Sequence, residues 1–142
     1  MPTTVAYKQT GHLNPELSGP AGKTLRSDNL TGHWLNTNRQ TQGIAECLVE
    51  RDGESFNLSI AAAGADGPIS WPRTKAKALA NLEEEAGQRA FALTATFDFG
   101  FMLAEIYIRV NKGVLVIVIF NSFHDDSGRS NYVNREFFYR RD

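Results

Sequence analysis

Three polar side chains alternate along one predicted strand, in the segment FMLAEIYIRV. Glu105, Tyr107 and Arg109 are two residues apart, so an extended chain places them on one face, about 7 Å from one to the next. A carboxylate and a phenol that face a cavity can transfer protons, and an arginine beside them can hold a polar substrate group. If this face points outward instead, the same residues form a surface or a subunit contact.

A second polar set occupies the last predicted strand, NYVNREFFYR, where Tyr132, Asn134 and Glu136 share one face. We expect this strand to neighbour the strand of Glu105, so that both sets converge on one cavity. A few convergent polar groups in an otherwise apolar cavity are typical of a small-molecule site. The opposite face of the Glu105 strand is apolar and is the more natural filling of a small barrel. That pattern favours the outward arrangement, and the cavity arrangement stays open.

The elements that position these residues are short strands separated by turn signals, from Leu30 to the end of the chain. Their spacing predicts an all-β fold, an antiparallel up-and-down barrel of about eight strands over residues 29–142. Residues 1–28 are rich in Pro, Gly, Thr, Ser and Asn, which predicts a flexible arm or a lid. Residues 74–88 have a helical composition, but their charges oppose the helix dipole, so we expect a strand from about 73 to 82.

One hairpin is predicted from Asp52-Gly53, a strong two-residue turn signal. Pairing outward from this turn sets Arg51 opposite Glu54. The pairs that follow place apolar residues on one face and mostly polar residues on the other. The apolar face holds Ala45, Cys47, Val49, Phe56, Leu58 and Ile60.

A second hairpin is predicted around the loop NKG, because a three-residue loop that ends in Gly113 suits a glycine bulge. This loop pairs Val110 with Val114. One face is then wholly apolar and comprises Ala104, Ile106, Ile108, Val110, Val114, Val116, Val118 and Phe120. The opposite face combines the polar set Glu105, Tyr107 and Arg109 with Leu103, Leu115, Ile117, Ile119 and Asn121.

Both faces of this second hairpin carry large aliphatic side chains, and only one face can point into a barrel. Each large aliphatic group left in water forgoes about 1.5–3 kcal/mol, and monomers rarely expose such a contiguous patch. We therefore expect a homodimer or a larger even oligomer, with the outer face of residues 101–123 near its centre.

The stretch LTGHWLNTN opens the first barrel strand with a Gly-x-Trp motif, Gly32 and Trp34, and Arg140 lies near the end of the last strand. This combination resembles the calycin superfamily, the lipocalins and avidins, over residues 30–140. The resemblance implies that Trp34 plugs one end of the barrel and stacks under Arg140. The chain lacks the lipocalin disulfides, the second lipocalin motif and the tryptophan set that avidins use, so biotin binding is not implied.

Composition narrows the classes of function. With 15 basic and 16 acidic residues the net charge is −1, so there is no electrostatic case for nucleic acid or an acidic membrane surface. The apolar run at residues 114–120 is far too short for a membrane helix. The first residues show no signal peptide, and the single Cys47 cannot form an internal disulfide, so we expect a cytoplasmic location.

Other motifs have structural interpretations. We expect DFG at residues 98–100 to be a turn, since no other kinase motif accompanies it. His124, Asp125 and Asp126 are expected in a solvated turn, because adjacent residues point in opposite directions and no second ligand cluster is evident. Cys47 falls on an apolar face and is expected to be an inert, buried thiol. No metal or cofactor is expected.

Three functions remain open. The first is binding of a small, mostly apolar molecule in the barrel. The second is a cofactor-free cyclase or isomerase of the small-barrel type, in which Glu105 and Tyr107 would assist proton transfer. The third is an oligomeric structural module with a filled barrel. The expected ligand contacts are Trp34, Tyr107, Arg109, Asn121, Tyr132 and Glu136.

Overall fold

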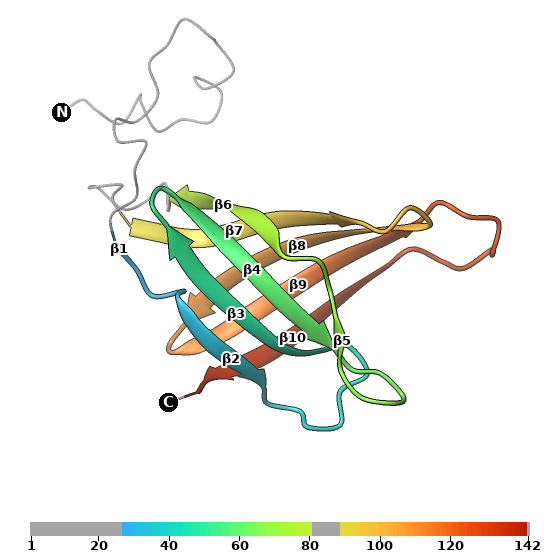
Figure 1. Cartoon of the computed structure of the whole chain (residues 1–142), viewed down its shortest axis with the longest axis horizontal. Coiled ribbons are helices and arrows are strands. Elements are labelled where there is room, and N and C mark those ends of the chain that lie inside the picture. Colours follow the sequence, from blue (N-terminus) through green and yellow to red (C-terminus); the bar gives the residue numbers. More distant parts are fainter. Residues whose placement is uncertain (1–26, 81–88, 142) are drawn as a thin grey trace, which may run out of the picture.

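The computed structural model describes residues 27–80 and 89–141 (Figure 1). The expected N-terminal arm, residues 1–28, therefore lies outside the described residues except for its last two. The described ranges contain no helix, and so none that could span a membrane. The strands are β1 (Ser27–Asp28), β2 (Gly32–Asn36), β3 (Ile44–Asp52), β4 (Ser55–Ala62), β5 (Ile69–Ser70), β6 (Thr74–Ala80), β7 (Arg89–Asp98), β8 (Met102–Asn111), β9 (Val114–Phe123) and β10 (Tyr132–Arg140).

Eight of these strands close into one barrel. The hydrogen-bonded order is β7-β6-β4-β3-β2-β10-β9-β8, and β8 pairs again with β7, so every barrel strand has two neighbours. All pairings around this ring are antiparallel, while β1 adds a short parallel pairing to β7. The predicted antiparallel barrel of about eight strands is confirmed, and residues 74–80 form a strand as expected.

The β3–β4 hairpin keeps its predicted faces but not its predicted pairs. Its loop is Gly53-Glu54, so Asp52 pairs with Ser55, and Arg51 pairs with Phe56 instead of Glu54. Gly53 has a φ of 61°, which suits the first loop position of a type II′ turn. Each partner moves by two residues, which preserves the faces because the side-chain period is two. A bulge between Ile44 and Glu46 also turns Ile44 into the core, so the prediction of Ala45 there was wrong.

The β8–β9 hairpin differs by one residue from the predicted pairing, and this slip exchanges the faces of β9. Its loop is Lys112-Gly113, with φ of 53° and 81°, so Val110 pairs with Leu115 rather than with Val114. Two positive φ values are typical of a type I′ turn, whose twist matches that of the strands. Facing inward are Ala104, Ile106, Ile108, Leu115, Ile117, Ile119 and Asn121. Facing outward are Glu105, Tyr107, Arg109, Val114, Val116, Val118 and Phe120.

Trp34 fills one end of the barrel. Its side chain is buried, and its indole N–H donates to the carbonyl of Leu30 at 2.8 Å. The guanidinium of Arg140 lies 4.6 Å over the ring, within cation–π range. Gly32 has a φ of 147°, and a Cβ there would come within 3.4 Å of Arg140 Nε. The plug of Trp34 under Arg140 is therefore present, and glycine permits the close approach.

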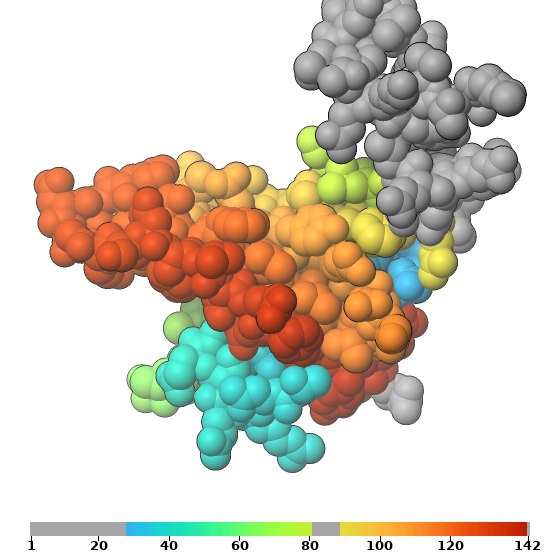
Figure 2. Space-filling model, turned by 180° about the vertical axis from the view of Figure 1, so that it is seen from behind, coloured from blue at the N-terminus to red at the C-terminus, as the bar shows by residue number. Residues whose placement is uncertain are grey.

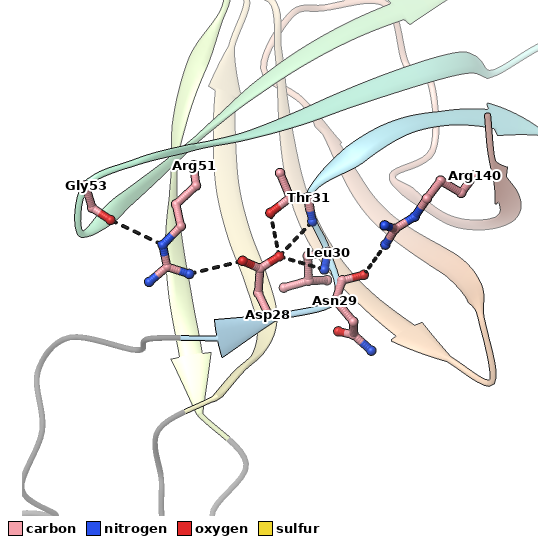
Figure 3. Close-up of polar contacts among 7 residues, drawn as sticks. All are labelled: Asp28, Asn29, Leu30, Thr31, Arg51, Gly53 and Arg140. Atoms are coloured by element: carbon pink, nitrogen blue, oxygen red, sulfur yellow. Dashed lines mark hydrogen bonds and ion pairs between the residues drawn. The ribbon is translucent and has the colours of Figure 1, made fainter. Parts of the chain in front are cut away.

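A cluster of hydrogen bonds around Asp28 holds the chain beside the buried Trp34 (Figure 3). One oxygen of Asp28 accepts from the amides of Leu30 at 2.9 Å and Thr31 at 2.8 Å, and also from the Thr31 hydroxyl. The other oxygen pairs with Arg51 at 3.1 Å. Burial by itself would raise the pKa of Asp28, but these hydrogen bonds outweigh burial and lower it.

We expect Asp28→Asn to destabilise the protein by about 1–2 kcal/mol at neutral pH, because the amide cannot accept from all four donors. The lowered pKa means that the carboxylate stabilises the fold above its unfolded-state value and loses this effect as pH falls through the folded-state value. The difference between the variant and the parent should therefore shrink below about pH 4. Urea unfolding across pH measures it, and Asp126→Asn, at an exposed site, is the control. A penalty that does not change with pH would contradict the role of the charge.

Candidate functional site

The barrel end opposite Trp34 is here called the mouth, and it is formed by the loops at residues 37–43, 63–73, 99–101 and 124–131. Figure 1 shows these loops at the end away from β1, with the β9–β10 connection extending beyond the rest. Four strands bring inner side chains here in two rows. The strand register gives one row as Ala95, Ile106, Ile119 and Asn134, and the next, closer to the mouth, as Phe97, Ala104, Asn121 and Tyr132.

Burial changes between this region and the rest of the interior. One row deeper toward Trp34, the side chains of Leu93, Ile108 and Ile117 are 0% exposed. Ala95 is 8% exposed and Ile119 is 5% exposed, although both face inward. These inward residues near the mouth are thus slightly less buried than Leu93, Ile108 and Ile117. We call Trp71, Ala95, Phe97, Ile106, Ile119 and Asn121 the mouth cluster.

Aromatic rings form one side of the mouth cluster. The ring of Trp71 lies 5.0 Å from that of Phe97 and 5.2 Å from that of Phe99, both edge to face. The amide of Trp71 donates to the carbonyl of Ile60 at 2.9 Å, which fixes the segment before β6 against β4. Edge-to-face pairs hold rings in defined positions, so this side of the cluster is preorganised.

Asn121 is the polar member of the mouth cluster. Its side chain faces inward from β9 and is only 6% exposed. No hydrogen bond joins its amide to another residue in the described part of the chain, although its polar atoms keep some accessible surface. Water can therefore reach this amide, and a ligand that enters the mouth would replace that water as its hydrogen-bond partner. An Asn amide can both donate and accept, so it complements a carbonyl, a hydroxyl or another amide.

Asn36 is as buried as Asn121, at 7% exposed, but its amide is fully used. Its nitrogen donates to the carbonyl of Ile44 at 2.8 Å and to Glu136 at 2.6 Å. Its oxygen accepts from the amide of Asn38 at 2.8 Å. Asn36, a buried asparagine with a structural role, therefore has hydrogen-bond partners within the fold, whereas Asn121 has none among the described residues.

Glu136 faces inward from β10, but its carboxylate is occupied. One oxygen accepts from Asn36 and from the Thr41 hydroxyl, and the other from the Ile44 amide at 3.1 Å and from Asn134 at 3.3 Å. A Cβ at Gly43 would lie 2.2 Å from this carboxylate, so the loop can approach it only with glycine. Glu136 thus fastens the β2–β3 loop to β10, and all of its nearest partners are donors.

The set Glu105, Tyr107 and Arg109 lies on the outside of the barrel, the second of the two arrangements considered from the sequence. Glu105 is exposed, Tyr107 is half-buried, and the Arg109 guanidinium lies 5.1 Å over the Phe91 ring. The expectation that β8 neighbours β10 was wrong, because β9 separates them. The two polar sets therefore lie on opposite faces of the barrel wall and do not converge.

The remaining expected contacts are dispersed. Trp34 belongs to the plug at the far end of the barrel. Tyr132 lies at the rim of the mouth, 52% exposed, with its ring 6.1 Å from that of Phe123. Of the residues expected to touch a ligand, Asn121 and Tyr132 are thus adjacent, as register partners on β9 and β10.

The other motifs have the structural roles expected of them. Asp98 accepts from the Gly100 amide at 2.8 Å in the β7–β8 turn, and Asp125 pairs with Arg129 within the β9–β10 loop. Burial raises the pKa of Cys47 to about 12, so its thiol is neutral and inert. Among the described residues, no three His, Cys, Asp or Glu side chains gather as a metal site requires.

Two open hollows flank the β2–β3 loop, and the larger one lies between the mouth loops at residues 37–43 and 63–73. One has a volume of about 330 Å³ and includes Asn38, Arg39 and Tyr139, and the other, of about 710 Å³, includes Arg39, Gln42 and Gly64. In the smaller hollow, the buried Asn36 uses its amide within the fold. The mouth cluster is the stronger candidate, because it joins an apolar and aromatic wall to the amide of Asn121, which bonds no other described residue.

Sequence reasoning missed the aromatic side of this site. The alternation of residues 89–98 places Ala95 and Phe97 on one face, so the sequence does indicate that these two residues point the same way. Trp71 comes from the short irregular segment before β6, where no periodicity indicates its direction.

Comparison of the chain with protein-family models, with curated proteins and with solved structures gives no match. The strand pairing shows an eight-stranded antiparallel barrel, an architecture consistent with the calycins.

We expect Glu136→Gln to lower the free energy of unfolding by about 1–3 kcal/mol, because one acceptor oxygen becomes a donor that faces other donors. Thermal and urea unfolding measure the effect. Glu46→Gln is the matched control, since among the described residues the Glu46 side chain makes one partly exposed contact, with His33 at 3.2 Å, of a kind worth about 0–1 kcal/mol. Equal effects of the two substitutions would show that Glu136 does not fasten the loop.

Proposed function

We propose that the protein binds a small, mostly apolar molecule at the mouth cluster, where Asn121 forms a hydrogen bond with a carbonyl, hydroxyl or amide group of that molecule. The observation that carries this proposal is the inward amide of Asn121, which bonds no other described residue although Asn121 is only 6% exposed. A ligand that supplies a hydrogen-bond partner there would take the place of solvent at this amide.

The chemistry of the surrounding side chains supports a neutral ligand. Ala95, Ile106 and Ile119 are apolar, and the Trp71 and Phe97 rings offer edges and faces for an apolar or aromatic group. The nearest inward carboxylate, Glu136, already accepts four hydrogen bonds and so has little capacity left for a cationic ligand. An apolar wall with one convergent polar group is the usual composition of a small-molecule site.

Binding is better supported than catalysis. The cyclase hypothesis assigned proton transfer to Glu105 and Tyr107, and these side chains point away from the interior. We also propose that the chain is related to the calycins, because Trp34 lies under Arg140 as that resemblance implies. The proposal includes a reducing, cytoplasmic setting as well, because the one cysteine is buried and unpaired.

We expect Asn121→Leu to weaken binding of N-phenyl-naphthylamine, an apolar fluorescent probe with one N–H donor, by about tenfold. Leucine has a similar shape but cannot accept the hydrogen bond. The variant should be about as stable as the parent, because the Asn121 amide has no hydrogen bond with a described residue to lose and leucine has a similar volume. Fluorescence titration and urea unfolding measure the two effects.

Two further variants make this test specific. Ala95→Phe adds bulk to the mouth cluster and should block the probe while Asn121 is intact. Glu105→Gln, on the outer face, should bind the probe as the parent does. If Asn121→Leu binds normally but Glu105→Gln does not, the site lies on the outer face and the proposal is wrong.

A further inference from the structure

The outer face of β8, β9 and β10 is unusually apolar for a surface. Val133 is 61% exposed, Phe120 is 50% exposed and Phe137 is 42% exposed. Figure 2 views the barrel from the side on which the orange and red strands β9 and β10 lie at the front. We call the outward residues Tyr107, Val116, Val118, Phe120, Val133 and Phe137 the outer patch. Exposed apolar patches of this kind mark contact surfaces.

The opposite side of the barrel is polar. There the outward residues of β3, β4 and β6 are mostly polar, with Leu48 and Leu79 as aliphatic exceptions, and include Glu46, Glu50, Asn57, Ser59, Lys75 and Lys77. The larger group of exposed apolar side chains therefore lies on the β8–β10 side. We expect a partner to cover that side rather than the other.

The strand register places the outer patch in rows that also contain Arg109 and Arg135. Each row can pair with the same row of a second copy. In the middle row, Tyr107 on β8 and Arg135 on β10 flank Val118 on β9. In the next row, Arg109 and Phe137 flank Val116 in the same way. Each row thus has an arginine on one side, an aromatic ring on the other and a valine between them.

We propose that a second copy of the chain covers the outer patch, related by a two-fold axis that runs along β9. This axis stacks the β9 stripe of each copy on that of the other and places β8 of one copy over β10 of its partner. Arg135 then meets the partner's Tyr107, and Arg109 meets the partner's Phe137. Cation–π contacts of this type are strongest when they are desolvated, and aromatic residues with arginine are typical of interface centres.

Charge decides between this axis and the alternative that runs across the strands. An axis across the strands through Val118 would set Arg135 against the partner's Arg135, and like charges in contact disfavour association. The Glu105–Arg109 pairs that it would gain have to be desolvated, and this cost offsets much of the attraction between the charges. The axis along β9 is therefore the arrangement that the side chains favour.

Sedimentation equilibrium of the full chain should show a species of twice 15.8 kDa. Val118→Glu brings two carboxylates together on the axis and should weaken dimerisation by about a hundredfold or more. Val118 faces outward, so far-UV circular dichroism of this variant should be unchanged. Leu48→Glu is the control, because Leu48 is an outward aliphatic residue on β3, and it should dimerise as the parent does.

Cross-linking tests the direction of the axis. A mixture of Tyr107→Cys and Arg135→Cys chains with a short bis-maleimide should form cross-linked dimers faster than either variant alone. Cys47 does not interfere, because it is buried and its pKa is about 12. Faster cross-linking of each variant with itself would overturn the proposed axis. A parent protein that is monomeric at every concentration, or a dimer unaffected by Val118→Glu, would overturn the proposal as a whole.

Discussion

The two-residue turn at Lys112-Gly113 is the constraint on which the rest of this structure depends. It sets the register between β8 and β9, and in a strand of alternating side chains the register decides which residues face the interior. With this turn, Leu115, Ile117 and Ile119 pack inside. A loop one residue longer would have turned the valines of β9 inward and Asn121 outward. Both the candidate site and the outer patch follow from this one turn.

The two ends of the barrel are organised differently. At the closed end, Trp34 is buried under Arg140, and Asp28 receives hydrogen bonds from neighbouring amides, a hydroxyl and Arg51. Near the mouth, inner side chains keep some exposure, and Asn121 has no partner among the described residues. Hydrogen bonds of Asp28 at the closed end and of Glu136 at the β2–β3 loop thus stabilise both ends, while the amide of Asn121 stays available to a ligand. Binding sites commonly have this character, because a group that serves a ligand cannot also be satisfied by the fold.

Strand β9 contributes to both proposals through opposite faces. Asn121 and Ile119 face the mouth cluster, whereas Val118 and Phe120 face the outer patch. A dimer that covers the outer patch would stiffen the strand that carries Asn121 without obstructing the mouth. The two surfaces can also be tested independently, since a substitution on one face of β9 leaves the other face in place.

The sequence by itself determined the class of fold and several local features. The alternating strands predicted the barrel, the Gly-x-Trp motif with Arg140 predicted the plug, and the apolar face of residues 45–51 predicted the burial of Cys47. These features depend on local periodicity or on one residue pair, which a single chain displays directly.

Only the tertiary structure decided which face of β9 is inside, and therefore where the candidate site lies. Both faces of residues 114–120 are apolar, so hydrophobic pattern could not choose between two registers that differ by one residue. The ring order likewise placed β9 between β8 and β10, which separated the two polar sets that the sequence suggested would meet. Trp71, from an irregular segment, and Glu136, bound to Asn36 across 100 residues of chain, took their positions from barrel closure. Contacts of this kind have no local signal, because they arise only when distant strands are brought together.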